Sequence, residues 1–225
     1  MNYYSVAIDG PAGAGKSTIA RKTAVALGFV YVDTGAIYRT VAYGVDVHQT
    51  DPADHKAVEE LLPQLKVELS WSADGLQHMF LNGEDVTGKI REPKISQLAS
   101  QLSALPAVRD FLMETQRDTA RKHSVVMDGR DIGTVVLPNA HVKIFLFASA
   151  EERAKRRWLE LKNAGKEIPY GEVYREMCER DERDSNRSVA PLKPAEDAVM
   201  LDTSKLTLQE SIDAVIHIIR KKTEL

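Results

Sequence analysis

The residues with the clearest chemical signature form a glycine-rich loop near the start of the chain. The run Gly10-Pro11-Ala12-Gly13-Ala14-Gly15-Lys16-Ser17 matches G-x-x-x-x-G-K-[ST] at every fixed position, and Thr18 follows it. Glycines let backbone N–H groups converge on phosphate oxygens, where Cβ atoms would crowd them. Lys16 suits the β- and γ-phosphates, and the Ser17 hydroxyl suits Mg²⁺. We therefore expect the segment 10–18 to bind a nucleoside triphosphate.

A second group of polar residues follows the next apolar segment, in the run Asp33-Thr34-Gly35-Ala36-Ile37-Tyr38-Arg39. Loops at the carboxyl ends of strands are where open α/β sheets bind ligands. With Thr34 at a helix start and Arg39 about one turn further, this segment is suited to a second phosphate. The alternative is that Thr34 is only a helix N-cap and Arg39 only a surface residue.

A third group, Asp128-Gly129-Arg130-Asp131-Ile132-Gly133-Thr134, also follows an apolar run. An aspartate that ends a strand beside a phosphate-loop strand, here Asp128, is suited to support a Mg²⁺ site from behind its ligands. Arg130 and Asp131 would then project into the cleft. The alternative is ordinary turn chemistry, in which Asp and Gly simply end a strand.

A fourth group lies in a densely charged segment, Ala150–Arg187, that is interrupted near Gly165 and Pro169. Arg180, Asp184 and Arg187 are spaced i, i+4 and i+7, so they share one helix face. Two guanidinium groups beside a carboxylate suit a sugar phosphate. The alternative is a solvated ladder of intrahelical ion pairs, because the segment after Ala150 has ten basic and ten acidic residues.

The elements that must position these groups alternate as β and α, which predicts a parallel sheet covered on both faces. Period and composition predict strands at Ser5–Asp9, Phe29–Asp33, Ser124–Asp128, His141–Ala148 and Ala198–Asp202. The same criteria predict helices at Lys16–Leu27, Pro106–Lys122 and Thr207–Lys222. Between them, Lys66–Lys89 alternates with period two and contains Asn82-Gly83, which predicts a small antiparallel insertion.

Composition excludes several classes of protein. The 225 residues carry a net charge of −3, which argues against nucleic acid as the partner. One cysteine and scattered histidines do not make a zinc site. The sequence has neither a membrane-spanning apolar run nor the features of a signal peptide, so we expect a cytoplasmic protein.

The absence of two motifs narrows the activity. No N-K-x-D follows a later strand, so a switch GTPase is disfavoured. No H-R-D-x-x-x-x-N loop supplies a base for a hydroxyl acceptor. A phosphate monoester needs no base, since its second pKa near 6 leaves it mostly dianionic at neutral pH.

At these residues the chain resembles the bacterial cytidylate kinases. The resemblance runs from Ser5 to about Lys222 and rests on V-D-T-G-A-I-Y-R, D-G-R-D-I-G-T-V-V and E-R-D-E-R-D-S-N-R in this order. It implies an α/β P-loop fold of three layers, with a five-stranded parallel core, an antiparallel β insertion and a helical lid. It further implies ATP- and Mg²⁺-dependent phosphorylation of CMP and dCMP.

The resemblance also implies roles for individual residues. Lys16, Arg130, Arg180 and Arg187 would act on the transferring phosphoryl group. Thr34, Arg39 and Arg130 would bind the acceptor phosphate. Arg180 and Asp184 would hold the pentose, and the cytosine would be read by Ser100, Arg109 and Asp131.

The expected division is a core of residues 1–62, 107–150 and 188–225, an insert at 63–106 that binds the monophosphate, and a lid at 151–187. We expect a monomer that binds neither nucleic acid nor a membrane. Two alternatives stay open, namely another P-loop kinase of monophosphates or small molecules, and a nucleotide sensor without turnover.

Overall fold

The central sheet follows from the buried apolar strands of the sequence. The computed structural model describes residues 3–223. Five parallel strands lie in the order β2 (Val30–Asp33), β6 (Val125–Gly129), β1 (Ser5–Asp9), β7 (Val142–Phe147) and β8 (Val199–Asp202). Asp9 is paired with Gly129, and Asp33 with Asp128. The three strands β1, β2 and β6 therefore end at one edge of the sheet, where their polar residues meet.

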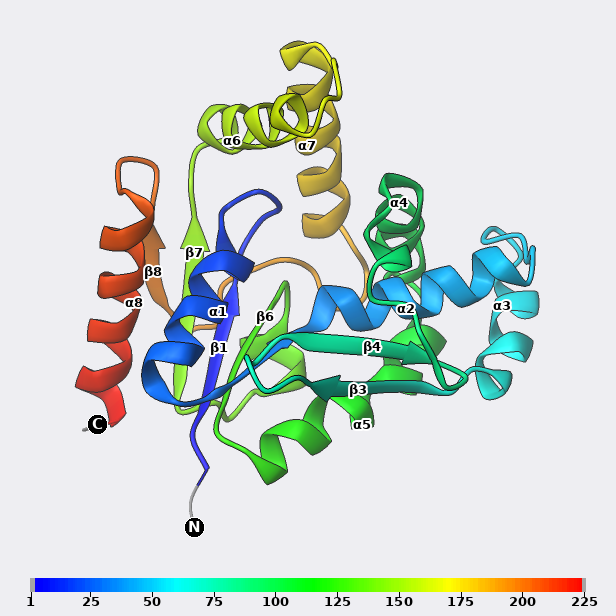
Figure 1. Cartoon of the computed structure of the whole chain (residues 1–225), viewed down its shortest axis with the longest axis horizontal. Helices are drawn as coiled ribbons and strands as arrows, with labels where there is room; N and C mark the ends of the chain where they lie inside the picture. Colours follow the sequence, from blue (N-terminus) through cyan, green and yellow to red (C-terminus); the bar gives the residue numbers. More distant parts are fainter. Residues whose placement is uncertain (1–2, 224–225) are drawn as a thin grey trace.

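Helices cover both faces of this sheet (Figure 1). Helices α1 (Lys16–Leu27) and α8 (Leu208–Thr223) pack on one face through Ile19, Ala24 and Val215, among others. Helices α2 (Thr34–Val47) and α5 (Pro106–Lys122) share the second apolar cluster with the opposite face. Burial on both faces explains the nearly continuous apolar runs of the strands. The predicted three-layer fold is confirmed.

The insertion is a second, antiparallel sheet of β3 (Val67–Trp71), β4 (Gln77–Leu81) and β5 (Glu84–Asp85). Asn82 and Gly83 join β4 to β5 with φ of 52° and 86°, as a tight hairpin turn of this type requires. The hairpin predicted from this dipeptide is confirmed. Two α-helices and two short 3-10 helices flank this sheet in the chain, namely α3 (His55–Leu61), η1 (Leu62–Gln64), η2 (Lys89–Arg91) and α4 (Pro93–Leu102).

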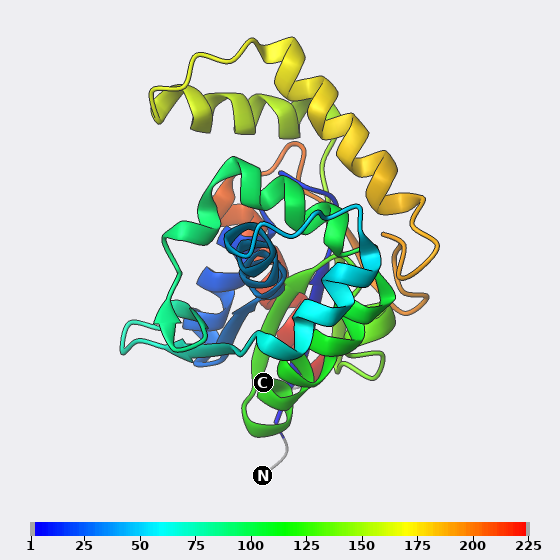
Figure 2. The same ribbon diagram turned by 90° about the vertical axis from the view of Figure 1, so that its right-hand side faces the viewer.

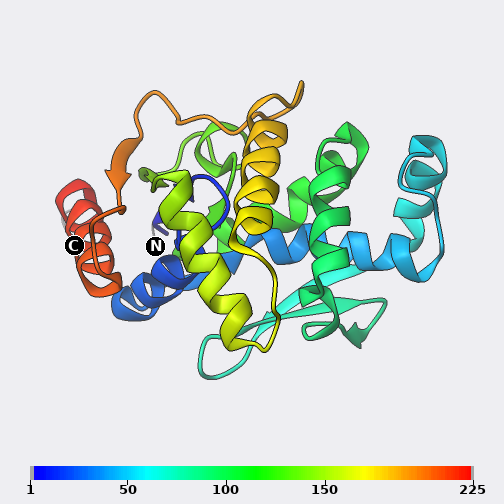
Figure 3. The ribbon, with the colours of Figure 1, turned by 90° about the horizontal axis from the view of Figure 1, so that it is seen from above.

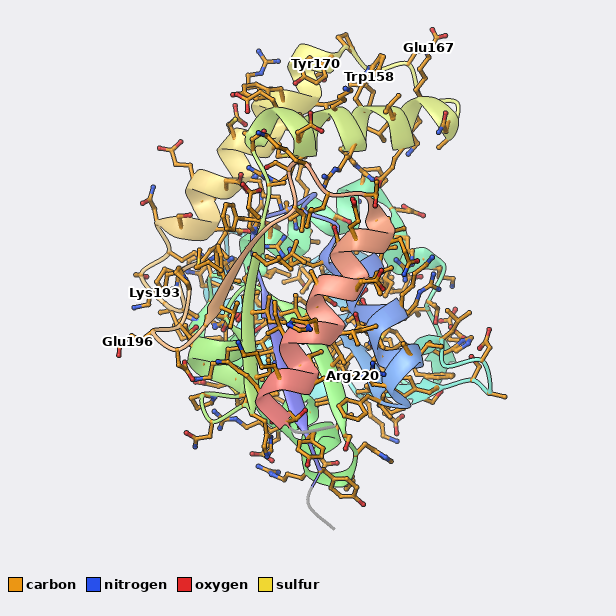
Figure 4. The ribbon with its side chains drawn as sticks, turned by 90° about the vertical axis from the view of Figure 1, so that its left-hand side faces the viewer. Trp158, Glu167, Tyr170, Lys193, Glu196 and Arg220 are labelled. Carbon is orange, nitrogen blue, oxygen red and sulfur yellow. The ribbon has the colours of Figure 1, made fainter. Side chains whose placement is uncertain are left out.

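The charged segment forms two helices, α6 (Ala150–Asn163) and α7 (Tyr170–Ser185), which are packed against each other. Figure 2 shows this pair lying above the rest of the chain. Trp158 and Tyr170 meet edge to face at 6.4 Å near the outer end of the pair, far from the sheet (Figure 4). The interruption predicted near Gly165 and Pro169 is the loop between the two helices.

The structure corrects some predicted details. Four of the five strands begin or end one residue away from the predicted limits, since β2 begins at Val30 and β6 ends at Gly129. The sequence analysis gave no bounds for helices α2, α3 and α4. Asp33, and not Thr34, is the N-cap of α2, because its Oδ1 accepts from Ala36 N at 2.8 Å. In the described range no helix has the length and apolarity to cross a bilayer.

Candidate nucleotide and phosphoryl-transfer site

The glycine-rich loop has the backbone that its sequence predicts. Gly10 has a φ of 148°, and a Cβ there would lie 1.9 Å from the Leu146 carbonyl oxygen. Gly15, with a φ of 87°, is the residue before the first turn of α1. Side chains at these positions would strain the backbone or collide with β7. The loop consequently leads directly into a helix N-terminus, which attracts anions.

Lys16 is the first residue of α1, directly after the loop, and is buried. Its Nζ donates to the Pro11 carbonyl at 2.6 Å. Burial, together with the nearby positive charge of Arg130, lowers the pKa of Lys16 well below its usual value. An incoming polyphosphate would supply the negative charge that this ammonium lacks, so the site is suited to an anionic ligand.

The Ser17 hydroxyl at the end of the loop donates to Asp128 Oδ2 at 2.9 Å. Tyr31 donates its hydroxyl to the other oxygen, Oδ1, at 2.8 Å. Burial, and then the nearby charge of Asp33, raises the pKa of Asp128 to about 6. The structure thus places Asp128 behind Ser17, as its position after an apolar strand predicts.

This arrangement fits a divalent cation held mainly by its substrate. Ser17 is exposed and carries a hydroxyl oxygen of the kind that Mg²⁺ prefers. Behind it, burial and the charge of Asp33 disfavour the ionised form of Asp128, which a nearby cation would stabilise. Among residues 3–223 no group of three His, Cys, Asp or Glu side chains forms a metal cage. Mg²⁺ in kinases takes few protein ligands and keeps phosphate oxygens and waters, so one hydroxyl at this position is sufficient.

The start of α2 is the second anchor of the site. Thr34 Oγ1 donates to the carbonyl of Asp128 at 2.7 Å and so joins β2 to β6. Arg39 forms an ion pair with Asp33 at 2.9 Å. Arg39 is therefore not a free surface residue, and its guanidinium is held at the carboxyl edge of the sheet.

The loop after β6 contacts the long helix α7. Arg130 Nε donates to Asp184 Oδ2 at 2.9 Å, and Arg187 pairs with Asp184 Oδ1 at 2.8 Å. The two arginines outweigh the effect of burial and hold the pKa of Asp184 below its usual value. The alternative of an intrahelical ladder of ion pairs does not account for this cluster, because Arg130 lies in the loop after β6 and Arg187 lies beyond the last residue of α7.

A buried ion pair joins Arg109 on α5 to Asp131. Arg109 also donates to the Ser103 carbonyl at 3.1 Å, and the same guanidinium lies 5.7 Å from the centre of the Tyr38 ring. Ser103 accepts from Arg187 at 3.2 Å through its hydroxyl. Ser100 lies one turn earlier on α4 and is half-buried. The predicted base-reading residues thus lie near one another between α4, α5 and the loop after β6.

Several donors of this cluster have no partner within the described part of the chain. The Nε atoms of Arg39, Arg180 and Arg187 are buried and make no hydrogen bond. Burial, followed by the charge of Arg130, lowers the pKa of Arg180 to about 10. Buried polar groups without partners are costly and rare. Their gathering here indicates an anion site, since phosphate oxygens would satisfy such donors.

Sequence reasoning missed Arg153, which belongs to α6. Its guanidinium donates to the carbonyls of Ala148 and Ala12, each at 2.9 Å, and pairs with Asp181 on α7 at 2.6 Å. It therefore ties both helices of the pair to the glycine-rich loop. A Cβ at Gly13 would lie 2.9 Å from Met177 Cε, and from above the two helices lie over this loop (Figure 3). An arginine in a densely charged helix carries no sequence signal that would single it out.

Known proteins share this arrangement of motifs along nearly the whole chain. The model of the family described as cytidylate kinase matches residues 6–221. The cytidylate kinase of Desulfitobacterium hafniense is 49% identical over 97% of this chain and 94% of its own length. Those of Caldicellulosiruptor bescii and Carboxydothermus hydrogenoformans are 47% and 48% identical, each over 98% of this chain and 97% and 99% of their own lengths. The chain belongs to the cytidylate kinase family.

Proposed function

We propose that this enzyme transfers the γ-phosphoryl group of ATP to CMP and dCMP, with Mg²⁺ bound to the phosphates. The observation that carries the proposal is that, among the described residues, the Nε atoms of Arg39 on α2, Arg180 on α7 and Arg187 just after α7 are buried without a hydrogen-bond partner. A phosphate loop accounts for one polyphosphate. This second set of donors is suited to another phosphate, which belongs to the acceptor.

The buried arginines of the site favour a phosphate acceptor over a hydroxyl acceptor. A hydroxyl acceptor needs a base that takes its proton, whereas a dianionic phosphate needs none, so the task is to position two anions and to screen their charge. Arg39, Arg180 and Arg187 each have a buried Nε without a partner among the described residues, and guanidinium groups suit phosphate oxygens. This favours a phosphate acceptor over the hydroxyl groups of the alternative.

The donor and acceptor nucleotides take different parts of the site in this proposal. Residues 10–18 hold the ATP phosphates, with Lys16 on the β- and γ-oxygens. Thr34, Arg39 and Arg130 hold the acceptor phosphate, and Arg180 and Asp184 hold the pentose. Arg187, which bridges Asp184 and Ser103, is placed to screen the transferring group. Ser100, Arg109 and Asp131 read the cytosine.

Mg²⁺ would be held by the Ser17 hydroxyl, with Asp128 accepting from that hydroxyl or from a bound water. When bound, the cation draws charge from the phosphate oxygens. The residues of this chain do the remaining work. Backbone amides of the loop orient the polyphosphate, and Asp128 fixes the rotamer of Ser17 through the 2.9 Å hydrogen bond.

We further propose that residues 151–187 close over ATP as a lid. Residues 63–106 form the insert that binds the acceptor, and residues 1–62, 107–150 and 188–225 form the core. Closure would exclude water that hydrolyses ATP. The contacts of Arg153 with Ala12 and Asp181 support this function, because they join the lid to the phosphate loop. We also propose that the protein is a monomer that acts in the cytoplasm.

The deciding experiment is an ADP-release assay with ATP, Mg²⁺ and a panel of acceptors. The panel contains CMP, dCMP, UMP, AMP and a sugar with free hydroxyl groups. We expect turnover with CMP and dCMP far above the rest. Preferred turnover of another monophosphate would reassign the acceptor, and tight ATP binding without any diphosphate product would support a nucleotide sensor.

A further inference from the structure

The free edge of strand β2 is covered by side chains of the insert. In the sheet order β2 has β6 on one side only, so its other edge presents backbone groups of Tyr31 and Asp33. Trp71 Nε1 donates to the Tyr31 carbonyl at 2.8 Å. Gln77 accepts from the Asp33 amide at 2.7 Å and donates to the Asp33 carbonyl at 3.2 Å.

Trp71 and Gln77 are cross-strand partners in the β3–β4 hairpin, so their side chains lie on the same face of the insert. The Gln77 carboxamide faces one N–H and one C=O of the same residue, which fixes its orientation. It makes the pair of bonds that a neighbouring strand would make. Gln77 is buried, and the loss of its amide would leave two backbone groups of Asp33 without partners.

Asp33 is the residue through which β4 contacts the acceptor side of the site. Its carboxylate caps α2 through Ala36 N at 2.8 Å and pairs with Arg39 at 2.9 Å. The next residue, Thr34, bonds to the Asp128 carbonyl. The backbone position of Asp33 therefore decides where both the Thr34 hydroxyl and the Arg39 guanidinium lie.

We infer that Gln77 is a positioning residue for the acceptor phosphate, acting from the insert through Asp33 on Arg39 and Thr34. The inference deepens the proposed function and rests on it. Trp71 supplies the matched control, because its bond to the same strand edge ends two residues before Asp33. A purely structural role for the hairpin would make the two residues equivalent.

The test compares Gln77→Met with Trp71→Phe, in steady-state kinetics and in thermal melts. Both variants remove hydrogen bonds to β2 while keeping apolar volume, so we expect both to lower the Tm. We expect Gln77→Met to raise the KM for CMP about ten-fold, since small displacements of positioning groups cost up to about a hundred-fold. The KM for ATP should stay within about two-fold, and Trp71→Phe should leave the KM for CMP unchanged.

Gln77→Glu provides a second variant of nearly the same shape, which keeps the acceptor for the Asp33 amide but loses the donor. We expect its KM for CMP to be raised as well. In an Arg39→Ala background, Gln77→Met should add little, because residues that act through one another are not additive. Equal KM values for CMP in the wild type and both Gln77 variants would overturn the inference, as would full additivity with Arg39→Ala. Wild-type turnover of CMP tests the proposed function separately from these ratios.

Discussion

Arg130 in the loop after β6 and Asp184 on helix α7 form a hydrogen-bonded ion pair, with Nε and Oδ2 2.9 Å apart. The two residues are 54 positions apart in the chain. Arg187 occupies the other carboxylate oxygen, so Asp184 pairs with two guanidinium groups at once and leaves the cluster with a net positive charge. Helix α7, part of the proposed lid, is thus connected to the core by charges that also belong to the proposed acceptor site.

Asp184→Asn is expected to lower kcat/KM for CMP by about ten- to a hundred-fold. A charge-assisted hydrogen bond contributes roughly 1.5–3 kcal/mol, and here the carboxylate pairs with two arginines and, in the proposed function, holds the pentose. Glu182→Gln, at an exposed carboxylate on the same helix, is the control and should keep wild-type kinetics. Steady-state assays with CMP and dCMP measure the effect, and similar values for the two variants would contradict the assigned position of Asp184.

Closure of the lid is expected to appear in amide hydrogen exchange. Residues 151–187 should exchange more slowly once a bisubstrate analogue, in which a phosphate chain joins adenosine to cytidine, occupies both sites. The buried strands β1 and β6 are the internal control and should not change. If the segment 151–187 is equally protected with and without the analogue, it is a static, salt-bridged surface.

Lys16→Ala is expected to reduce kcat by about a hundred- to a thousand-fold, which is typical for the loss of a group that stabilises developing charge. The fold should persist, because the lost partner in the protein is a single carbonyl, that of Pro11. Lys22→Ala, at an exposed position of the same helix, serves as the control. The measurement is kcat at saturating ATP and Mg²⁺, with circular dichroism to verify the fold. A normal kcat in Lys16→Ala would remove the loop from the mechanism.

The sequence predicted the parts of the molecule that depend on local patterns. The phosphate loop, the sheet strands and the turn at Asn82-Gly83 have signatures within a few residues of each other. The candidate site residues Lys16, Ser17 and Asp128 were singled out in this way, because each lies at a strand end or a helix start. Arg130 and Asp184 were named individually, but their pairing across 54 positions was not predicted.

The interactions that sequence reasoning missed have no local signature. Arg153 is one arginine among many in a charged helix, and only the packing of α6 against the glycine-rich loop gives it three partners. Gln77 lies in an alternating strand, where a glutamine carries no signal that would single it out as a functional residue. It shares the buried face of β4 with Met79 and Leu81, and its partner there, the free edge of β2, is a property of the strand order that the hairpin sequence does not reveal.

Asp128→Asn is expected to reduce the pH dependence of stability. The pKa of Asp128 is about 6 in the folded protein, against the ordinary aspartate value of 3.8 expected in the unfolded chain. The native state therefore binds this proton more tightly than the unfolded state does. Stability therefore rises as the pH falls through about 6 and levels off below about 4. Urea unfolding between about pH 7.5 and pH 5 measures this slope in both proteins.

Asp9 has a pKa that is likewise raised to about 6 by burial, and it is present in both proteins. The difference between the two slopes therefore isolates Asp128. Parallel slopes would mean that Asp128 titrates near its ordinary value in the folded state. Parallel slopes would also remove one reason to expect a cation beside Ser17, namely that burial and Asp33 disfavour the negative charge of Asp128.

Asp131 is the proposed selector of the base. Cytosine presents its N4 amino donor where uracil presents the O4 acceptor. An ionised carboxylate accepts from the first and repels the second, and Arg109 and Ser100 would donate to the acceptors of cytosine. Burial raises the pKa of Asp131, but the charges of Arg109 and Arg187 oppose that rise and favour the ionised form.

Asp131→Asn is expected to lower kcat/KM for CMP and to narrow the gap between CMP and UMP, because the amide can rotate to donate toward O4. One such contact contributes roughly 1–3 kcal/mol, or about ten- to a hundred-fold in specificity. The buried ion pair between Asp131 and Arg109 offers the competing explanation, in which Asp131 only orients Arg109. That explanation requires both efficiencies to fall by the same factor. The ratio of kcat/KM for CMP to that for UMP, measured in the wild type and in Asp131→Asn, decides between the two, and an unchanged ratio assigns the selection to another residue.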